Sequence, residues 1–231
     1  MEKTILITGA NKGIGYEIAR QTGLMGFEVI ISGRSKEKLE TSSKQLADLG
    51  IKTSILLMDV SSQKSIQEAF EELKSRKIFI EVLINNAGIS LRNDNKLTLD
   101  DESILNNILQ TNSFGPLRVT KTFLPLIKRP GRIIMISSSG GIINGPVPGW
   151  SPAYCVSKTL LNAFTKQLAY DLMNERIAVN AVCPGWVKTD MGGKNAPRTL
   201  EKGAETPVWL AVEAPQNLTC KFLKDKVEID W

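Results

Sequence analysis

The chain begins its first regular pattern with Thr4-Ile5-Leu6-Ile7-Thr8-Gly9-Ala10-Asn11-Lys12-Gly13-Ile14-Gly15. A short apolar strand runs into a glycine-rich turn, and a helix carrying Ile18 follows. Gly9 allows a tight turn, Gly13 lets the backbone approach a pyrophosphate, and Gly15 lets helix and strand pack closely. The helix N-terminus then faces the anion. A glycine-rich turn alone also fits a plain loop, but its place as the first strand–helix turn predicts a dinucleotide-binding fold.

Strand and helix patterns alternate along the rest of the chain, and the strands are near-continuous apolar runs. Such runs are typical of a parallel sheet that is covered on both faces. We therefore expect one doubly wound α/β Rossmann domain over residues 1–231, with a mostly parallel sheet of about seven strands. Gly115-Pro116 should bend or interrupt the longest helix. The predicted strands are 4–8, 27–32, 54–58, 81–85, 132–137, 177–182 and 221–223, and the main helices are 36–49, 103–128, 153–173 and 199–212.

Composition limits where the protein works. Of 231 residues, 42% are hydrophobic, and no apolar run approaches the roughly twenty residues that span a bilayer. The net charge is +5, but lysines and arginines alternate with acidic residues along helices, which indicates a solvated surface and no nucleic-acid partner. The strand pattern begins at Thr4 and leaves no room for a signal peptide. These features predict a cytoplasmic protein without a membrane anchor.

Histidine is absent, and the three cysteines, Cys155, Cys183 and Cys220, are scattered. The chain therefore lacks the residues for a Ser-His-Asp or Cys-His nucleophile. No pair of cysteines has metal-ligand spacing, so we predict no metal site. Acid–base chemistry has to come from Tyr, Lys, Asp or Glu.

The second strand ends in Ser32-Gly33-Arg34-Ser35, where NAD-binding chains carry a carboxylate for the ribose 2′-hydroxyl. Arg34 occupies that place, and Lys12 lies in the glycine turn. A guanidinium can hold a 2′-phosphate through paired hydrogen bonds, whereas a carboxylate would repel it. The pattern favours NADP(H), although Arg34 alone also fits an ordinary surface arginine.

Tyr154 and Lys158 are four residues apart near the start of an apolar helix, after the glycine- and proline-rich loop 140–152. They share one helix face. A lysine cation about 4 Å from a tyrosine contributes on the order of 4 kcal/mol at an effective dielectric constant of about 20. That would lower the tyrosine pKa by roughly three units from about 10. The pair suits proton transfer at neutral pH, whereas a lone Tyr-x-x-x-Lys is more often a surface pair.

Four motifs occur together in order, and with them the chain resembles the short-chain dehydrogenase/reductase family over nearly its whole length. The motifs are the 8–15 turn, Asn85-Asn86-Ala87-Gly88, Tyr154-Cys155-Val156-Ser157-Lys158 and Pro184-Gly185. Residues 191–196 and the tail 221–225 ending in Trp231 are similar to the carbonyl-reductase-like branch. Monomeric carbonyl reductases carry a longer insertion before the tyrosine, which this chain lacks. With two long helices apolar on more than one side, this suggests a homodimer.

The resemblance implies a role for each matching residue. Tyr154 and Lys158 would be catalytic, and Asn112 would organise a proton-relay water. Asp59 and Val60 would lie by the adenine, Asn85 and Ala87 along the adenosine ribose, and the Pro184-Gly185 segment with Thr189 at the nicotinamide. The full predicted cofactor set is Gly9, Asn11, Lys12, Gly13, Ile14, Gly15, Arg34, Asp59, Val60, Asn85, Ala87, Gly88, Tyr154, Lys158, Pro184, Gly185, Val187 and Thr189.

The catalytic serine of the family lies about thirteen residues before the tyrosine, which would be Gly141 here. The triplet Ser137-Ser138-Ser139 fits the Ile-Ser-Ser pattern better. We choose Ser138, which would donate a hydrogen bond to the substrate oxygen as charge develops. Trp150, Trp186 and Met191 fall in segments that should border the substrate, where they either form an apolar pocket or simply pack.

The leading hypothesis is an oxidoreductase that moves a hydride between NADP(H) and a carbonyl or alcohol, such as a ketone, aldehyde or quinone. A non-catalytic NADP-binding regulatory protein on the same fold is the alternative. The joint presence of Asn112, Ser138, Tyr154 and Lys158 argues against it. A sugar-nucleotide epimerase of the extended branch would need a C-terminal substrate domain, and fewer than fifty residues follow Pro184.

Overall fold

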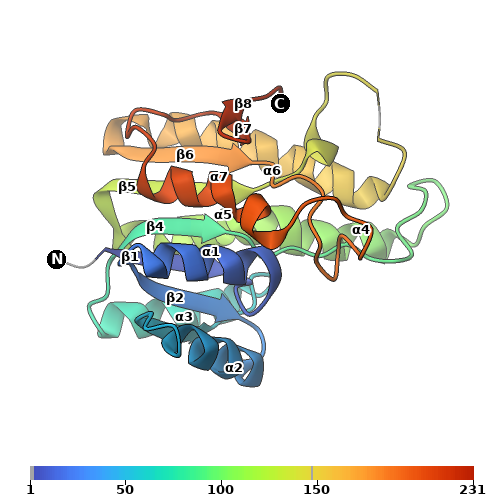
Figure 1. Ribbon diagram of the computed structural model, residues 1–231. Coiled ribbons are helices and arrows are strands. Elements are labelled where there is room, and N and C mark those ends of the chain that lie inside the picture. Colours follow the sequence, from blue (N-terminus) through green and yellow to red (C-terminus); the bar gives the residue numbers. More distant parts are fainter. Residues whose placement is uncertain (1–2, 147) are drawn as a thin grey trace.

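One sheet in the order β3-β2-β1-β4-β5-β6-β7-β8 runs through the computed structural model, which describes residues 3–146 and 148–231 (Figure 1). Residues 1–2 of the predicted domain and position 147 of the predicted loop 140–152 lie outside the described residues. The strands are β1 (Thr4–Thr8), β2 (Glu28–Gly33), β3 (Thr53–Leu57), β4 (Ile80–Asn85), β5 (Ile127–Ile136), β6 (Ile177–Val182), β7 (Phe222–Lys224) and β8 (Val227–Glu228). All pairings are parallel except that of β7 with β8.

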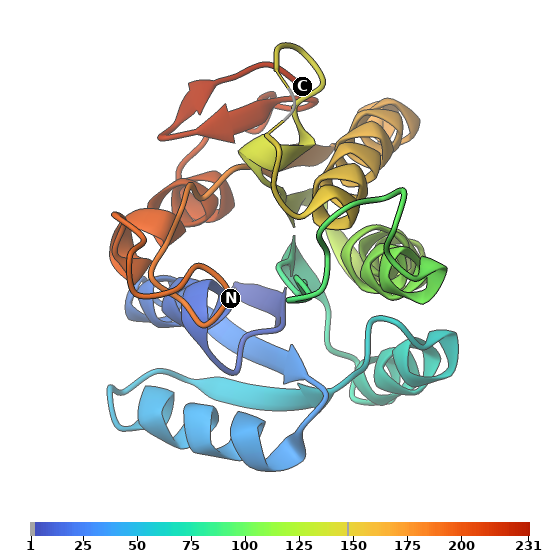
Figure 2. The same cartoon turned by 90° about the vertical axis from the view of Figure 1, so that its right-hand side faces the viewer.

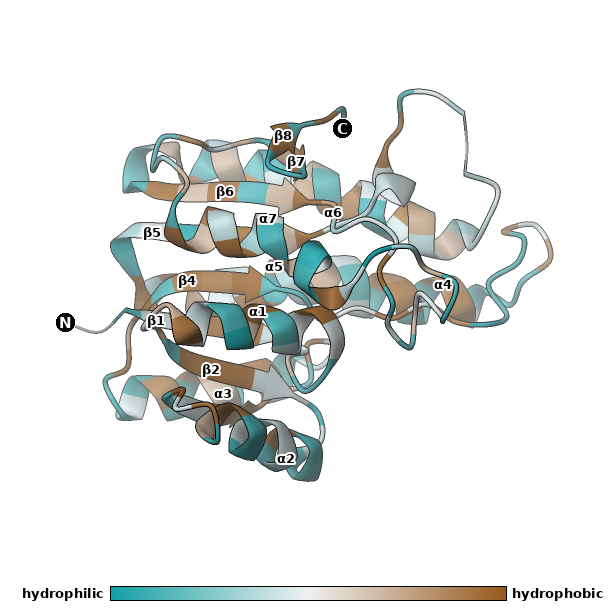
Figure 3. Ribbon diagram, viewed as in Figure 1, coloured by the Kyte–Doolittle hydropathy of each residue, from teal (hydrophilic) through white to brown (hydrophobic). Residues whose placement is uncertain are grey.

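Helices cover both faces of the sheet (Figure 2). Successive strand side chains point to opposite faces, so Ile5 and Ile7 belong to one core and Leu6 to the other. Apolar colour therefore concentrates in the strands, and polar colour on the outer helix surfaces (Figure 3). One face carries α1 (Gly13–Leu24), α2 (Lys36–Ala47) and α7 (Leu200–Val212); the other carries α3 (Gln63–Ser75), α5 (Gly115–Phe123) and α6 (Pro152–Asp171), with α4 (Glu102–Leu109) packed on α6.

The predicted helix 103–128 is interrupted, as expected, beside the Gly115-Pro116 pair: a π-helical turn at Gln110–Phe114 separates α4 from α5, which begins at Gly115. The predicted end of the helix is wrong, because Ile127 pairs with Ile80 and begins β5. After α5 the chain makes only a short 3₁₀ turn, Leu124–Leu126, which contains Pro125.

The sheet has eight strands within the described residues, one more than predicted. Asp225 and Lys226 both adopt positive φ angles, 53° and 63°, and turn the chain back after β7. This tight turn adds β8 as an antiparallel edge strand. The doubly wound, mostly parallel architecture that the sequence predicts is confirmed.

The strand order reverses between β1 and β4, and ligands of doubly wound folds bind beyond the carboxyl ends of such strands. Thr8 and Asn86 join these two ends. The Asn86 side-chain amide donates to the Thr8 carbonyl oxygen at 2.9 Å, and the Ala87 N–H donates to the Thr8 hydroxyl at 3.0 Å. These bonds fix the edge on which the candidate site is built.

In the described ranges 3–146 and 148–231, no helix is both long and apolar enough to cross a membrane. The same ranges hold no group of three or more cysteine, aspartate or glutamate side chains that could bind a metal ion.

Candidate active site

The glycine turn is closely packed against the end of β4. Gly9 has a φ of 64°, and a Cβ atom on it would lie 2.8 Å from the Ala87 Cα. A Cβ on Gly15 would lie 2.4 Å from the Asn86 amide nitrogen. Lys12 occupies the N-cap of α1, and its side chain does not cap the helix. The first N–H groups of α1 therefore have no side-chain cap, and with the glycine turn they form a cradle of backbone groups that fits a cofactor pyrophosphate.

Arg34 lies at the carboxyl end of β2 and is exposed. Across the described part of the chain, Arg34 has no hydrogen-bond or ion-pair partner. Lys12 instead forms an ion pair with Asp190, at 2.5 Å, in the segment after Thr189. Both side chains are exposed, so this pair contributes little to stability. Arg34 is thus an exposed cation at the end of β2, while Lys12 is paired with Asp190.

The ends of β3 and β4 supply the residues predicted for the adenosine. The Asp59 carboxylate accepts from the Ser61 N–H and hydroxyl, at 2.9 and 2.7 Å, and Val60 beside it is buried. The Asn85 side chain is buried and donates to the Thr120 hydroxyl at 3.1 Å, while its Oδ1 has no partner. Asn85 therefore faces the α5 side of the sheet, and any contact with a ribose falls to its backbone.

Tyr154 and Lys158 lie in the first turns of α6, as predicted, and Asp94 holds the start of that helix. The nearly buried Asp94 carboxylate accepts from the backbone N–H groups of Ala153 and Tyr154, both at 2.9 Å. Ser151, at the N-cap position, makes no side-chain cap. A carboxylate at a helix N-terminus is favoured by the helix dipole. Asp94 thereby ties the loop after β4 to the backbone of Tyr154.

Burial dominates the electrostatics of the Tyr154–Lys158 pair. It raises the pKa of Tyr154 to about 12, while a hydrogen bond with Ser138 lowers that pKa in part. Burial also lowers the pKa of Lys158 to about 8. The Lys158 Nζ donates to the Ile136 carbonyl oxygen at 2.8 Å and lies 5.5 Å from the centre of the Tyr154 ring. The expected drop in the tyrosine pKa is therefore wrong for this geometry, because burial raises that pKa by more than the hydrogen bond with Ser138 lowers it.

The three candidate serines face different ways. The buried Ser137 hydroxyl donates to Asn162 Oδ1 at 2.6 Å, which points it away from Tyr154. Ser139 is exposed. The Ser138 hydroxyl accepts from the Gly140 N–H at 3.1 Å and is the one that bonds to Tyr154. At the alternative position, Gly141, a Cβ would lie 2.7 Å from the Lys158 backbone. The geometry therefore favours Ser138.

Asn112 lies in the π-helical turn and is fully buried. Its amide donates to the Ile89 carbonyl oxygen and its Oδ1 accepts from the Ile89 N–H, both at 2.8 Å. The same amide donates to the Ser157 hydroxyl at 3.1 Å. A Cβ on Gly88 would lie 3.4 Å from Asn112 Oδ1 and 3.6 Å from the Lys158 Nζ. Asn112 thus fixes the backbone after β4 beside the Lys158 ammonium.

The large apolar residues predicted for the substrate pocket, Trp150, Trp186 and Met191, divide into two groups. The half-exposed Trp150 has its ring centre 5.8 Å from that of Tyr154. Trp186 and Met191 are exposed on the segment after β6, where the Trp186 indole N–H donates to the Gly192 carbonyl oxygen at 2.7 Å. The structure thus brings Trp150 next to Tyr154 and leaves the other two on an open segment.

The segment after β6 also lies against the glycine turn. A Cβ on Gly13 would lie 3.6 Å from the Thr189 methyl group, so these two predicted cofactor residues are neighbours. The Pro184 carbonyl oxygen accepts a hydrogen bond from Arg198 at 2.9 Å. Sequence reasoning did not find Arg198 or Asp94, since neither belongs to a motif. Asp94 falls in the irregular loop near 91–98, but nothing local shows which helix it caps.

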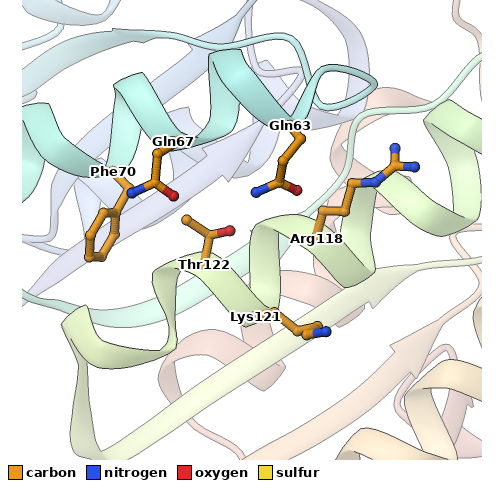
Figure 4. A pocket seen from close by; sticks show the side chains of 6 residues that line it. All are labelled: Gln63, Gln67, Phe70, Arg118, Lys121 and Thr122. Atoms are coloured by element: carbon orange, nitrogen blue, oxygen red, sulfur yellow. The ribbon is translucent and has the colours of Figure 1, made fainter.

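A separate hollow of about 260 Å³ lies between α3 and α5 and shares no residue with this site (Figure 4). The Arg118 guanidinium is occupied by a hydrogen bond to Gln110 at 2.6 Å, and the Lys121 chain runs away from the hollow. Its charges do not converge, and it is no competing active site. The lining residues are Gln63, Gln67, Phe70, Arg118, Lys121 and Thr122.

A family model described as short chain dehydrogenase matches residues 3–199, and the chain belongs to that family. Carbonyl reductase [NADPH] 1 of Sus scrofa is 30% identical over 99% of this chain and 94% of its own. Carbonyl reductase [NADPH] 3 of Rattus norvegicus is 31% identical over 99% and 98%. The predicted resemblance to the carbonyl-reductase branch is confirmed, and the protein is an oxidoreductase of this family.

Solved structures give the same result. The NADPH-bound carbonyl reductase from chicken fatty liver is 27% identical, with a TM-score of 0.88 over 100% of this chain and 99% of its own. The carbonyl reductase Sniffer of D. melanogaster is 28% identical, with a TM-score of 0.89 over 100% of both chains. A nicotinamide cofactor is typical of the family to which these proteins belong.

The serine assignment is tested by single replacements. Ser138→Ala should lower kcat for carbonyl reduction by roughly a hundredfold, because a donor to the developing oxyanion is lost. Ser139→Ala should leave kcat near the wild-type value. Ser137→Ala should mainly lower the free energy of unfolding, by about 1–3 kcal/mol, because Asn162 loses its buried donor. Steady-state kinetics and urea unfolding measure both effects. A larger kcat loss at Ser137 or Ser139 than at Ser138 would refute the assignment.

Proposed function

We propose that this protein is an NADPH-dependent carbonyl reductase in which Tyr154 gives a proton to the substrate oxygen. The proposal rests on the buried Lys158 ammonium, which lies 5.5 Å from the centre of the Tyr154 ring and donates to the Ile136 carbonyl oxygen at 2.8 Å, with Ser138 beside Tyr154. The chain has no histidine, so this Tyr–Lys pair with a serine donor is its candidate acid–base group. A panel of ketones, aldehydes and quinones, followed by loss of NADPH absorbance, tests it.

The residues present fit NADP(H). The cradle formed by Gly9, Gly13 and Gly15 would receive the pyrophosphate, and Arg34 the 2′-phosphate. The segment from Pro184 to Thr189 would hold the nicotinamide end. When bound, NADPH supplies the hydride, so the protein needs no nucleophile of its own.

The protein's part is then to bind, orient and move a proton. The Ser138 and Tyr154 hydroxyls would donate to the substrate oxygen, and Tyr154 would release its proton as that oxygen becomes negative. Lys158 stabilises the resulting phenolate by its charge, and its bond to the Ile136 carbonyl fixes its position. Asn112 keeps the backbone at Ile89 close to this lysine. Trp150 would form an apolar wall beside the reacting carbonyl.

The raised pKa of Tyr154 suits the direction of reduction. With a pKa of about 12, Tyr154 is protonated at neutral pH and can act as an acid. Alcohol oxidation would need the phenolate as a base, which is scarce at that pH. The protonated form of Tyr154 is the one that reduction of a carbonyl requires.

A homodimer is the assembly that we propose. On α6, Val156 and Tyr170 are 41% and 71% exposed, so apolar surface remains outside the core. Such a face on a long helix fits a two-fold interface.

The alternative function, a non-catalytic NADP-binding regulator, would bind cofactor but turn over none of the carbonyl compounds.

Tyr154→Phe should reduce kcat for carbonyl reduction at least a hundredfold, the loss that follows removal of an acid–base group. NADPH affinity and the unfolding midpoint should change little, because only one hydroxyl is removed. Tyr170→Phe on the outer surface of the same helix is the matched control. Turnover of Tyr154→Phe near the wild-type rate would show that another group supplies the proton.

The reduction rate should depend on the charge of Lys158. Burial lowers its pKa to about 8, so Lys158 is a cation below that pH and loses its charge above it. Tyr154 remains protonated across this interval because its pKa is about 12. We expect kcat/KM to be constant up to about pH 8 and to fall at higher pH. A kcat/KM that rises through pH 8, or that stays flat well above it, contradicts the role of the cation.

Arg34→Ala should weaken NADPH binding by about tenfold and leave NADH binding almost unchanged, because NADH has no 2′-phosphate for Arg34 to hold. Wild-type protein should prefer NADPH, and added salt should narrow the preference because Arg34 is exposed. Fluorescence titration of both cofactors measures this. Equal wild-type affinities, or equal losses in the variant, would remove Arg34 from the phosphate site.

A further inference from the structure

Arg198 joins the segment after β6 to the C-terminal hairpin. Its Nη1 donates to the Pro184 carbonyl oxygen at 2.9 Å. Its Nη2 donates to both carboxylate oxygens of Asp225, at 2.6 and 2.5 Å. The Arg198 side chain is only 19% exposed. One guanidinium therefore bridges two parts of the chain that would otherwise meet only at the edge of the sheet.

The backbone of Arg198 holds the same segment. Its N–H donates to the Trp186 carbonyl oxygen at 3.2 Å, and its carbonyl oxygen accepts from the Lys188 N–H at 2.9 Å. These bonds form a parallel bridge with Val187. Main chain and side chain of one residue thus fix residues 184–188 as a unit.

No residue larger than glycine fits at position 185 without displacing the Arg198 side chain. Gly185 has a φ of 79°, and a Cβ there would lie 2.6 Å from the Arg198 Cδ and 2.8 Å from its Nε. The arginine chain therefore occupies the space beside the glycine backbone. A change at Arg198 would release Gly185 directly.

Asp225 is well placed to hold this arginine. It lies in the tight turn between β7 and β8, and its hydrogen bond with Arg198 holds the pKa of its carboxyl below the usual range. Lys202 lies 3.9 Å from the same carboxylate. A lysine at position 198 could not reproduce the fork of donors that reaches Pro184 and Asp225 together.

We propose that Arg198, anchored by Asp225, is a positioning residue for the nicotinamide end of the cofactor. The inference rests on the proposed function, in which Pro184 and Gly185 hold that end. Arg34 lies at β2 and Arg198 beside the segment that follows β6, and three strands separate β2 from β6 in the sheet. Arg198 therefore acts on a part that NADPH and NADH share, whereas Arg34 acts on the 2′-phosphate alone.

The test measures binding of NADPH and NADH to wild type, Arg198→Ala, Arg198→Lys and Asp225→Asn. Arg198→Ala should weaken both cofactors by the same factor, about tenfold. Arg198→Lys and Asp225→Asn should do so by a few-fold. Hydride transfer from NADPH deuterated on one face of C4 provides a second readout. Wild type should transfer from one face only, and the variants should lose part of this selectivity.

Arg129 is a matched control. Its Nη2 forms an ion pair with Glu175 at 2.5 Å, and it donates to the Leu124 carbonyl oxygen at 3.2 Å, near the start of β5 and far from the site. Arg129→Ala should lower the unfolding midpoint but leave cofactor affinity and face selectivity unchanged. This separates positioning from a general loss of stability.

Unchanged affinity and face selectivity in Arg198→Lys and Arg198→Ala would overturn the inference, and so would a loss confined to NADPH. Should Arg198→Ala fail to fold, Arg198→Lys and Asp225→Asn decide between these outcomes. A wild-type protein that binds both cofactors but reduces no carbonyl compound contradicts the proposed function instead, and leaves the binding comparison intact.

Discussion

The contact between Gly9 and Ala87 determines how the rest of the site is built. A Cβ atom on Gly9 would lie 2.8 Å from the Ala87 Cα, so the backbone of the first turn lies directly against the backbone at the end of β4. From Ala87 the chain passes to Gly88, beside the Lys158 Nζ, and to Ile89, which Asn112 grips at both of its backbone groups. The short segment from Ala87 to Ile89 thus connects the phosphate cradle with the proton-transfer site.

Desolvation determines the protonation states at the Tyr154–Lys158 site. Lys158 is buried with one carbonyl oxygen as its hydrogen-bond partner, and burial lowers its pKa to about 8 from 10.5. A folded pKa below the unfolded one means that the buried charge opposes folding below about pH 8, and that stability rises as pH increases through this interval. The same dry surroundings keep the proton on Tyr154 until charge develops on the substrate. A buried cation stabilises a transient phenolate more strongly than the same cation would in water, because the local dielectric constant is lower.

Sequence patterns predicted the fold and most of the site because both depend on local rules. Apolar runs mark parallel strands, and Gly9 and Gly15 of the first turn occur where a Cβ would clash. The patterns failed where distant segments decide the outcome. The end of the helix at Phe123 depends on Ile127 pairing with Ile80, and the direction of the Tyr154 pKa depends on burial. Asp94 and Arg198 act on backbone groups 60 and 14 residues away, a relation that no motif records.

The proposed reaction requires that Tyr154 and Ser138 both face the substrate oxygen. A crystal structure of the protein with NADP⁺ and an unreactive ketone tests this requirement, because this pair binds without turnover. We predict that the ketone oxygen lies about 2.6–3.2 Å from both hydroxyl oxygens, the reach of a hydrogen bond. A ketone oxygen bound well beyond that distance from Tyr154, or held by another group, would contradict it.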